Sequence, residues 1–378
     1  MLPSNTSISK EIYKNIVSPI LNHLDSETWH DNVRKLLHTA EISPITLKIL
    51  ERFAFQGKRF TDEKLKVVVA NIKFDNPLLM GAGWDKAGKS VLALYTLGFS
   101  GVEVGSVTAY PQPGNPKPRQ FMIGPGVALN RLGFNNPGME QMAKNLDRYK
   151  KYGIPIGISI GKNKEVTQNE APEAHAKVVR RLYEYSSYFA LNVSSPNTPE
   201  LRKLQGKDLL TDNVQAINEV MNEKGGIKPT FVKIAPDLTN EEIDDVIRVV
   251  IDNGLTGIIA VNTTIRPDLK AKYGEKWRNE PGGLSGKDAE YRKMATEKVA
   301  HIYRETNGEI IIIGVGGCFD TNSTLEKIMA GATLVQFVTA MRSEGPTLPG
   351  RINSELVEFM EQEGIKSLDE IRGTNSKR

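Results

Sequence analysis

The chain runs Ile310-Ile-Ile-Ile-Gly-Val-Gly-Gly317, continues through a helix-like stretch at 324–330, and reaches a second apolar run, Thr333-Leu-Val-Gln-Phe-Val338. Each apolar run is too short for a helix, and such continuous Ile- and Val-rich runs are typical of strands buried on both faces. Two such strands separated by a helix predict a parallel β-α-β unit.

The same unit recurs along the chain from about residue 76. Eight apolar runs end in small or polar residues, and helical patterns such as the one at 241–253 separate most of them. Eight parallel units predict an α/β fold, a closed (β/α)8 TIM barrel. The runs are residues 78–81, 101–105, 155–160, 189–193, 230–234, 257–261, 310–315 and 333–338.

An open, doubly wound sheet is the alternative, because it would show the same alternation of strands and helices. Such sheets often bind dinucleotides through a Gly-x-Gly-x-x-Gly turn after the first strand. Here the first run is followed by Gly81, Ala82, Gly83 and, three residues later, Lys86 in place of the last glycine. The dinucleotide fingerprint is therefore incomplete, which favours the barrel.

The composition excludes several classes of protein. In 378 residues, 49 Lys and Arg against 45 Asp and Glu give a net charge of +4 without a clustered basic stripe, so we expect no nucleic-acid binding. The single cysteine, Cys318, excludes an intrachain disulfide and an iron–sulfur cluster, and we expect no metal site. No run approaches the roughly 20 apolar residues that cross a bilayer, and no signal or transit segment is expected.

The first 60 residues are predicted to be a helical extension of a barrel at 61–372, with a polar tail at 373–378. Apolar residues recur every four positions in the first helix, and a second helix begins near Ser26. Two helices of this size have too little mass for a core of their own, so they either pack on the barrel or contact a membrane surface. The periodicity fits both alternatives. The recurring residues are Ile12, Ile16, Ile20 and Leu24.

Polar and small residues follow nearly every predicted strand. Because the active site of a TIM barrel lies at the carboxyl ends of its strands, these side chains are the candidates for function. Two glycine-rich loops, at 282–286 and 314–317, would let backbone N–H groups approach a phosphate. They predict a phosphate-bearing cofactor, although turn glycines with positive φ would give the same pattern.

Several segments resemble motifs of the dihydroorotate dehydrogenases, in the order expected for that family and over residues 10 to 352. This resemblance implies oxidation of dihydroorotate to orotate in de novo pyrimidine biosynthesis, with FMN as hydride acceptor. The motifs are Pro111-Gln-Pro-Gly-Asn-Pro-Lys-Pro-Arg119, Asn130-Arg-Leu-Gly-Phe-Asn135, Gly161-Lys-Asn-Lys164, Asn192-Val-Ser-Ser-Pro-Asn-Thr198, Lys233-Ile-Ala-Pro-Asp237, Asn262-Thr-Thr264, Gly282-Gly-Leu-Ser-Gly-Lys287 and Gly314-Val-Gly-Gly317.

The resemblance also implies roles for individual residues. Ser195 would be the base that removes the substrate proton, Thr198 would assist the proton transfer, and Phe134 would exclude water. The soluble subfamily has cysteine at the position of Ser195, so serine favours the membrane-associated, quinone-dependent class 2. The implied substrate-binding residues are Lys86, Asn130, Leu132, Gly133, Phe134, Asn192, Asn197, Asn262 and Thr263. The implied FMN-binding residues are Gly81, Ala82, Gly83, Lys86, Ser106, Ser159, Asn192, Lys233, Val261, Ser285, Gly286, Gly316, Gly317, Phe337 and Thr339.

The implied quinone tunnel departs most from the family pattern. It would be lined by Leu21, His30, Met122 and Val338, but Met122 stands where the family has an arginine and Val338 where it has a tyrosine. Among the flavin contacts, Ser159 replaces an asparagine and Val261 a threonine.

Two other functions stay open beside the quinone-dependent enzyme. The first is the same dehydrogenase with fumarate or NAD as oxidant, and the second is a flavin-binding barrel without catalysis. We expect the quinone-dependent enzyme, as a monomer in peripheral contact with the cytoplasmic side of the cell membrane.

Overall fold

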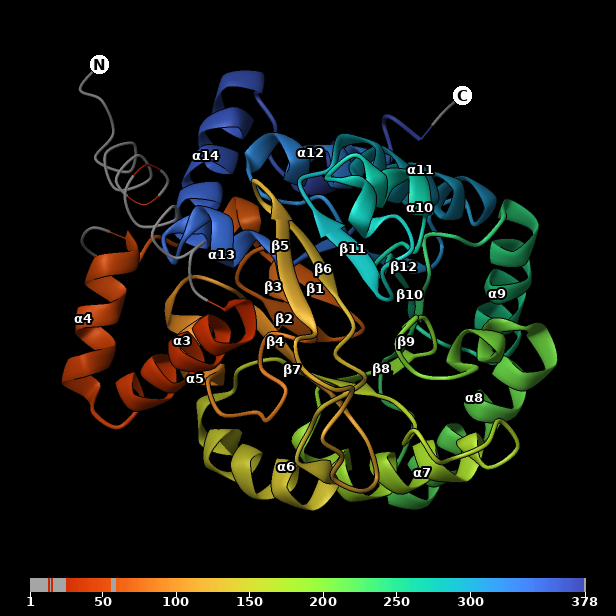
Figure 1. Cartoon of the computed structure of the whole chain (residues 1–378). Helices are drawn as coiled ribbons and strands as arrows, with labels where there is room; N and C mark the ends of the chain where they lie inside the picture. The colour runs from red at the N-terminus through yellow and green to blue at the C-terminus, as the bar shows by residue number, and fades with distance from the viewer. Residues whose placement is uncertain (1–12, 14, 16–24, 56–58, 377–378) are drawn as a thin grey trace.

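The computed structural model describes residues 13, 15, 25–55 and 59–376, and its centre is a barrel of eight parallel strands (Figure 1). The barrel is closed in the order β10-β12-β13-β3-β4-β7-β8-β9. All eight predicted strands are therefore confirmed, and the open sheet is excluded. The strands are β3 (Leu78–Met80), β4 (Gly101–Val107), β7 (Ile156–Ile160), β8 (Tyr188–Asn192), β9 (Thr230–Ile234), β10 (Gly257–Ala260), β12 (Ile311–Val315) and β13 (Leu334–Phe337).

Helices surround the barrel, as Figure 1 shows for α6 to α9 along its lower and right edges. Their starts follow local rules; for example, Thr239 and Glu242 form a reciprocal capping box at the start of α9. The helices that follow the first strand are α5 (Val91–Thr96), α6 (Gly138–Leu146), α7 (Ala171–Leu182), α8 (Lys207–Lys224), α9 (Asn240–Asp252), α10 (Pro267–Ala271), α11 (Ala289–Glu305), α12 (Thr321–Ala330), α13 (Ala340–Glu344) and α14 (Leu348–Glu363). Short 3-10 helices lie at Glu63–Leu65, Asp147–Tyr152, Tyr183–Tyr185, Leu201–Gln205, Glu275–Trp277 and Leu368–Glu370.

A two-stranded hairpin closes the amino-terminal end of the barrel. Strands β1 (Val67–Val69) and β2 (Ile72–Phe74) are antiparallel, and the two residues between them have positive φ. Val69 and Phe74 pack against the interior residues of the barrel, such as Tyr188 and Phe231. This end of the barrel is filled with apolar side chains, so a ligand can enter only from the opposite end.

A three-stranded antiparallel sheet lies across that opposite end, where the barrel strands terminate (Figure 1). It consists of β5 (Gln120–Gly124), β6 (Val127–Asn130) and β11 (Gly283–Gly286). The expectation of a flexible glycine loop at 282–286 is wrong, because β11 pairs with β6 over its whole length. Its glycines permit this close approach, since a Cβ on Gly286 would lie 2.1 Å from the backbone oxygen of Gly126.

The described part of the extension contains α3 (Ser26–Ala40) and α4 (Pro44–Phe55). Apart from residues 13 and 15, the first predicted helix lies outside the described residues. Helix α3 contacts β5 and α5, and α4 contacts α5 and α14. A buried ion pair fastens α3 to the sheet, because Glu27 lies 2.7 Å from Arg119 and both side chains are buried. These two helices therefore pack on the barrel, as one of the two alternatives predicted.

Candidate active site

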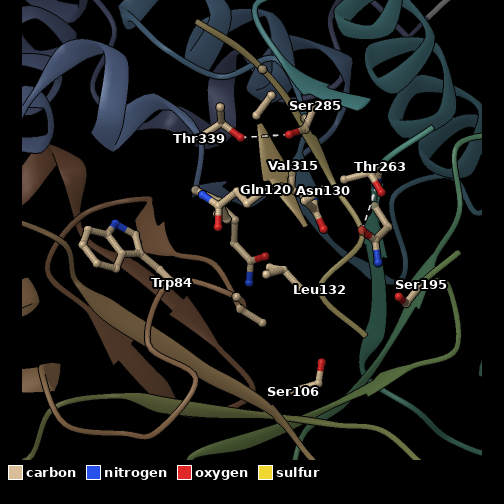
Figure 2. Close-up of a pocket in the computed structure, with 18 of the residues that line it drawn as sticks. Trp84, Ser106, Gln120, Asn130, Leu132, Ser195, Thr263, Ser285, Val315 and Thr339 are labelled. Atoms are coloured by element: carbon tan, nitrogen blue, oxygen red, sulfur yellow. Dashed lines mark hydrogen bonds between the residues drawn. The ribbon is translucent and has the colours of Figure 1, made fainter. Parts of the chain in front are cut away.

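One cavity occupies the carboxyl end of the barrel, under the β5-β6-β11 sheet and beside α3 (Figure 2). It encloses about 1420 Å³ of empty space, its open mouth included. Residues of the barrel strand ends, of the covering sheet and of α3 line it together. The predicted residues that line it are His30, Ala82, Gly83, Lys86, Ser106, Met122, Asn130, Leu132, Gly133, Phe134, Asn192, Ser195, Asn197, Lys233, Val261, Asn262, Thr263, Ser285, Gly286, Gly316, Gly317, Val338 and Thr339.

Four predicted residues lie behind the cavity wall, and Leu21 lies outside the described residues. Ser159 is fully buried, and its hydroxyl lies 2.7 Å from the hydroxyl of Ser106, which does line the cavity. The backbone N–H of Gly81, directly after β3, donates to the backbone oxygen of Phe337 in β13 at 2.9 Å. Both residues therefore belong to the barrel wall behind the cavity. Thr198 is buried, and its hydroxyl has no hydrogen-bond partner among the described residues.

Amide and hydroxyl side chains at the ends of four strands form one hydrogen-bond network. Asn192 donates to the Ser106 hydroxyl at 2.8 Å and accepts from the Ser194 hydroxyl at 3.0 Å. Asn262 in turn donates to Ser194 at 2.9 Å. Each amide is therefore held in one orientation, which prepares the network to recognise a polar ring by its donors and acceptors.

Ser195 lies in a loop after β8, and Figure 2 shows it on the opposite side of the cavity from Trp84. Its side chain is buried, and its hydroxyl oxygen accepts the backbone N–H of Asn197 at 3.3 Å. An N–H directed at this oxygen stabilises negative charge on it, so the hydroxyl gives up its proton at a lower cost than in water. Ser195 is thus suited to handle a proton.

Two glycines make room for neighbouring site residues. A Cβ on Gly161 would lie 2.7 Å from the Phe134 ring, so the ring can rest on the end of β7 only because residue 161 is glycine. A Cβ on Gly283 would lie 1.9 Å from the hydroxyl oxygen of Thr263. That hydroxyl is buried and has no hydrogen-bond partner in the described part of the chain, so it is available to a ligand.

The residues after β12 and β13 form an anion cradle. Gly316 and Gly317 have φ values of 103° and 74°, which L residues rarely adopt, and both line the cavity. Successive N–H groups in such a turn can converge on a phosphate. Nearby, the hydroxyls of Ser285 and Thr339 lie 3.0 Å apart (Figure 2). The donor set fits the phosphate of a flavin nucleotide.

Two buried lysines, Lys86 and Lys233, contribute positive charge to the cavity beside Arg342. Burial lowers the pKa of Lys86 to about 8, and Asp31 opposes this shift. Burial likewise lowers the pKa of Lys233, while Glu103 raises it. Protonated lysines in such a place bind a carboxylate or stabilise an anionic ring.

His30 closes the cavity on the α3 side. Its Nε2 lies 2.7 Å from the backbone oxygen of Trp84, and the two rings meet edge to face with centroids 4.4 Å apart. Burial, followed by the charge of Lys86, holds the pKa of His30 well below 6.5, so the ring is neutral and Nε2–H donates the hydrogen bond.

Sequence reasoning missed several residues that line the same cavity. Trp84 and Gln120 are the most informative, because the indole N–H and the amide oxygen are buried and lack hydrogen-bond partners among the residues described. Trp84 directly follows the predicted residue Gly83, and Gln120 directly follows the motif that ends at Arg119, so their positions in the chain could have identified them. The missed residues are Trp29, Trp84, Gly105, Gln120, Ala128, Asn135, Tyr291, Val315, Cys318, Gln336, Ala340, Met341 and Arg342.

Comparisons with known proteins give matches over most of the chain. A family model described as dihydroorotate dehydrogenase matches residues 64–360. The chain is 40% identical to a dihydroorotate dehydrogenase (quinone) of Chloroflexus aurantiacus over 91% of this chain and 96% of the relative, and 39% identical to one of a Nostoc species over 97% and 100%. Its fold is similar to the crystal structure of DHODH in complex with ferulenol from Eimeria tenella, with a TM-score of 0.84 and 31% identity over 96% of this chain and 99% of that one.

Proposed function

Because the chain belongs to the dihydroorotate dehydrogenase family, we propose that it oxidises (S)-dihydroorotate to orotate and passes the electrons through FMN to a membrane quinone. This is the redox step of pyrimidine biosynthesis. The observation that carries the proposal is the convergence of Ser195, the asparagine network and Lys86 on one cavity that also contains the glycine cradle.

The substrate has a ring with amide N–H and carbonyl groups and one carboxylate. Asn130, Asn192, Asn197 and Asn262 supply both donors and acceptors for such a ring. Lys86 supplies a positive charge for the carboxylate. These side chains fix the ring so that its two reacting carbons face opposite walls of the cavity, which removes much of the entropic cost of the reaction.

Oxidation removes a proton from one ring carbon and a hydride from its neighbour. The Ser195 hydroxyl releases its own proton toward Thr198 while its oxygen takes the proton from the ring carbon. The backbone N–H of Asn197 stabilises the negative charge that the oxygen carries during this exchange. Thr198 relays the proton onward, and the Phe134 ring keeps bulk water from the reacting carbons. The glycine cradle would hold the phosphate of FMN and Lys233 would lie at its ring, where the flavin would supply the hydride acceptor.

The electron acceptor binds at the α3 end of the cavity. Apolar side chains line this end, among them Trp29, Met122 and Val338. The Trp84 indole N–H, which has no described partner, can donate to a ring carbonyl. The Gln120 amide oxygen, which also has no described partner, can accept a hydrogen bond from a hydroxyl of the reduced ring. An apolar pocket with a few buried polar atoms suits a quinone. Fumarate would need cations for two carboxylates, whereas the guanidinium of Arg342 at this end already donates to Ser26 and lies over the Trp29 ring.

An apolar surface on the extension supports contact with a membrane. The side chains of Ile42, Ile45, Ile49 and Phe53 are 77%, 71%, 61% and 59% exposed, and Leu36 on α3 is 67% exposed. A run of large exposed apolar residues on adjacent helices marks an interaction surface. None of the described helices is long and apolar enough to cross a bilayer. We propose peripheral attachment at the cytoplasmic face, as a monomer.

The test is an anaerobic two-step mixing experiment on the purified protein. Dihydroorotate is added first and a short-chain ubiquinone second, while the absorbance of the flavin is followed. We expect bleaching and then recovery. Bleaching without recovery would overturn the acceptor and favour fumarate or NAD, whereas a protein without flavin, or one that dihydroorotate does not bleach, would overturn the dehydrogenase.

A further inference from the structure

Glu103 is a buried carboxylate inside the barrel, directly behind the wall of the site. It lies in the middle of β4, and its side chain is fully buried. Side chains from three other strands converge on it. The Gln336 amide nitrogen donates to one carboxylate oxygen at 2.7 Å, the Tyr188 hydroxyl donates to the same oxygen at 3.2 Å, and the Lys233 ammonium lies 3.8 Å from the other oxygen.

Two of these partners face the cavity, whereas Glu103 and Tyr188 do not. Lys233 and Gln336 line the cavity, from β9 and β13. Because Glu103 occupies the amide nitrogen of Gln336, the amide oxygen points away from the carboxylate, and this oxygen has no hydrogen-bond partner among the described residues. Glu103 therefore orients one cation and one acceptor at the same wall.

A carboxylate is needed there because a buried ammonium is unstable by itself. Burial lowers the pKa of Lys233, and Glu103 opposes the shift. In the described part of the chain, Lys233 forms an ion pair only with Glu103. The other groups around the carboxylate carry no charge, since Gln336 is an amide and burial, together with Glu103, keeps the pKa of Tyr188 well above 10. Without Glu103, Lys233 would lose its proton at a lower pH.

We propose that Glu103 is a positioning residue that keeps Lys233 protonated and, through Gln336, presents a matched cation and acceptor to the edge of the bound flavin. This inference rests on the proposed function, because it assumes that a flavin occupies the cavity. A flavin ring carries a carbonyl beside a ring N–H on its pyrimidine edge, which the cation and the Gln336 oxygen complement. The Lys233 charge also stabilises the reduced ring, which is anionic.

The test measures the midpoint potential of the bound flavin between pH 6.5 and pH 9.5 in the full-length protein. Glu103→Gln removes the countercharge, so Lys233 deprotonates earlier and the potential falls more steeply with pH than in the parent protein. At pH 9 we expect at least a tenfold weaker preference for reduced over oxidised flavin, which corresponds to about 30 mV for a two-electron couple. Glu173→Gln, an exposed carboxylate on α7, is the matched control and leaves the potential unchanged.

A double-variant cycle shows whether Glu103 acts through Lys233. In a Lys233→Met background, Glu103→Gln has no further effect on the pH dependence, whereas a purely structural carboxylate would change both backgrounds alike. If Glu103→Gln does not fold, Glu103→Asp takes its place. It keeps the charge but shortens the side chain, so we expect the potential to fall with pH more steeply than in the parent protein and less steeply than the loss of the charge would cause. Variants that retain flavin with the parent's pH dependence would overturn this inference alone, while a parent protein without flavin would overturn the proposed function.

Discussion

Nε2 of His30 lies 2.7 Å from the backbone oxygen of Trp84, so a helix of the extension is hydrogen-bonded directly to the loop after the first barrel strand. We expect His30→Leu to raise the KM for quinone about fivefold, because a neutral hydrogen bond of about 1 kcal/mol holds the acceptor end of the cavity in place. Steady-state kinetics with varied quinone measures this. The rate of flavin reduction by dihydroorotate stays near that of the parent.

His38→Leu is the matched control for this variant. His38 lies on the same helix, and its Nδ1 is 2.8 Å from the Lys89 oxygen, away from the cavity. The His38→Leu substitution removes an equivalent contact between α3 and the barrel, so we expect it to lower stability without changing the KM for quinone. Equal KM values in both variants and the parent would argue against the assignment of the α3 end to the acceptor.

Removing the Ser195 hydroxyl separates chemistry from binding. Ser195→Ala leaves the asparagine network intact, since the Ser195 hydroxyl accepts from the Asn197 backbone and not from that network. We expect flavin reduction by dihydroorotate to slow by about 10²- to 10⁴-fold, the usual contribution of a general base, with orotate binding within a small factor of the parent. Stopped-flow reduction and orotate titration check both. A rate like the parent's would exclude Ser195 as the base.

The pKa of Lys86 predicts the pH dependence of substrate capture. Burial lowers this pKa to about 8, so the free enzyme carries the charge that binds the carboxylate below pH 8 and loses it as the pH rises above 8. We expect kcat/KM for dihydroorotate to be level below pH 8 and to fall about tenfold per pH unit above it. Lys86→Met should lower the plateau value of kcat/KM roughly 30-fold, because a charged hydrogen bond contributes about 2 kcal/mol. The decrease of kcat/KM above pH 8 should disappear in this variant. Lys89→Met, in the same loop, should keep the profile of the parent.

The barrel was predictable because its strands carry a strong local signal. A parallel strand buried on both faces must be apolar along its whole length, and β12, Ile311–Val315, shows this directly. The sheet over the cavity was missed for the opposite reason. Every residue of β5, Gln120–Gly124, is half-buried, so the strand has neither a continuous apolar run nor a clear alternation. The sheet is completed by the pairing of β6 with β11, residues 127–130 with 283–286, and a pairing between such distant segments leaves no local pattern in the sequence.

The candidate site was predictable where it follows strand ends and not where distant segments meet. Asn192 lies at the end of one apolar run, Asn262 directly follows another, and Lys86 stands five residues after a third, so the sequence marks them as site residues. Glu103 does not stand out, because one charged residue inside Gly101-Val-Glu-Val-Gly105 reveals nothing about the three strands that surround it. The partners of a barrel-interior side chain depend on the closure of the sheet, which local patterns do not contain.

A second buried histidine predicts how stability depends on pH. His175 in α7 is fully buried, its Nδ1 lies 2.6 Å from the side-chain oxygen of Asn213 in α8, and burial lowers its pKa to about 4. The unfolded chain binds this proton near pH 6.5, so the stabilisation is complete above pH 6.5 and is lost as the pH falls toward 4. At pH 5 the loss is roughly 2 kcal/mol. In urea unfolding at pH 7.5 and pH 5, His175→Gln should show a smaller difference between the two conditions than the parent; equal differences would exclude His175 as the titrating group.

The exposed surface of α4 predicts how the protein reaches a quinone that is dissolved in lipid. Ile45→Glu combined with Ile49→Glu places two charges on this surface, and each isoleucine contributes about 2 kcal/mol when buried in an apolar phase. We expect vesicle binding to weaken by roughly two orders of magnitude or more in cosedimentation. Turnover with a long-chain quinone in vesicles falls with it, while flavin reduction by dihydroorotate in solution does not.

Ile251→Glu is the control, because Ile251 is 51% exposed on α9 and belongs to no comparable apolar surface. If the double variant bound vesicles as the parent does, α4 would not be the membrane contact, and the exposed isoleucines would need another partner.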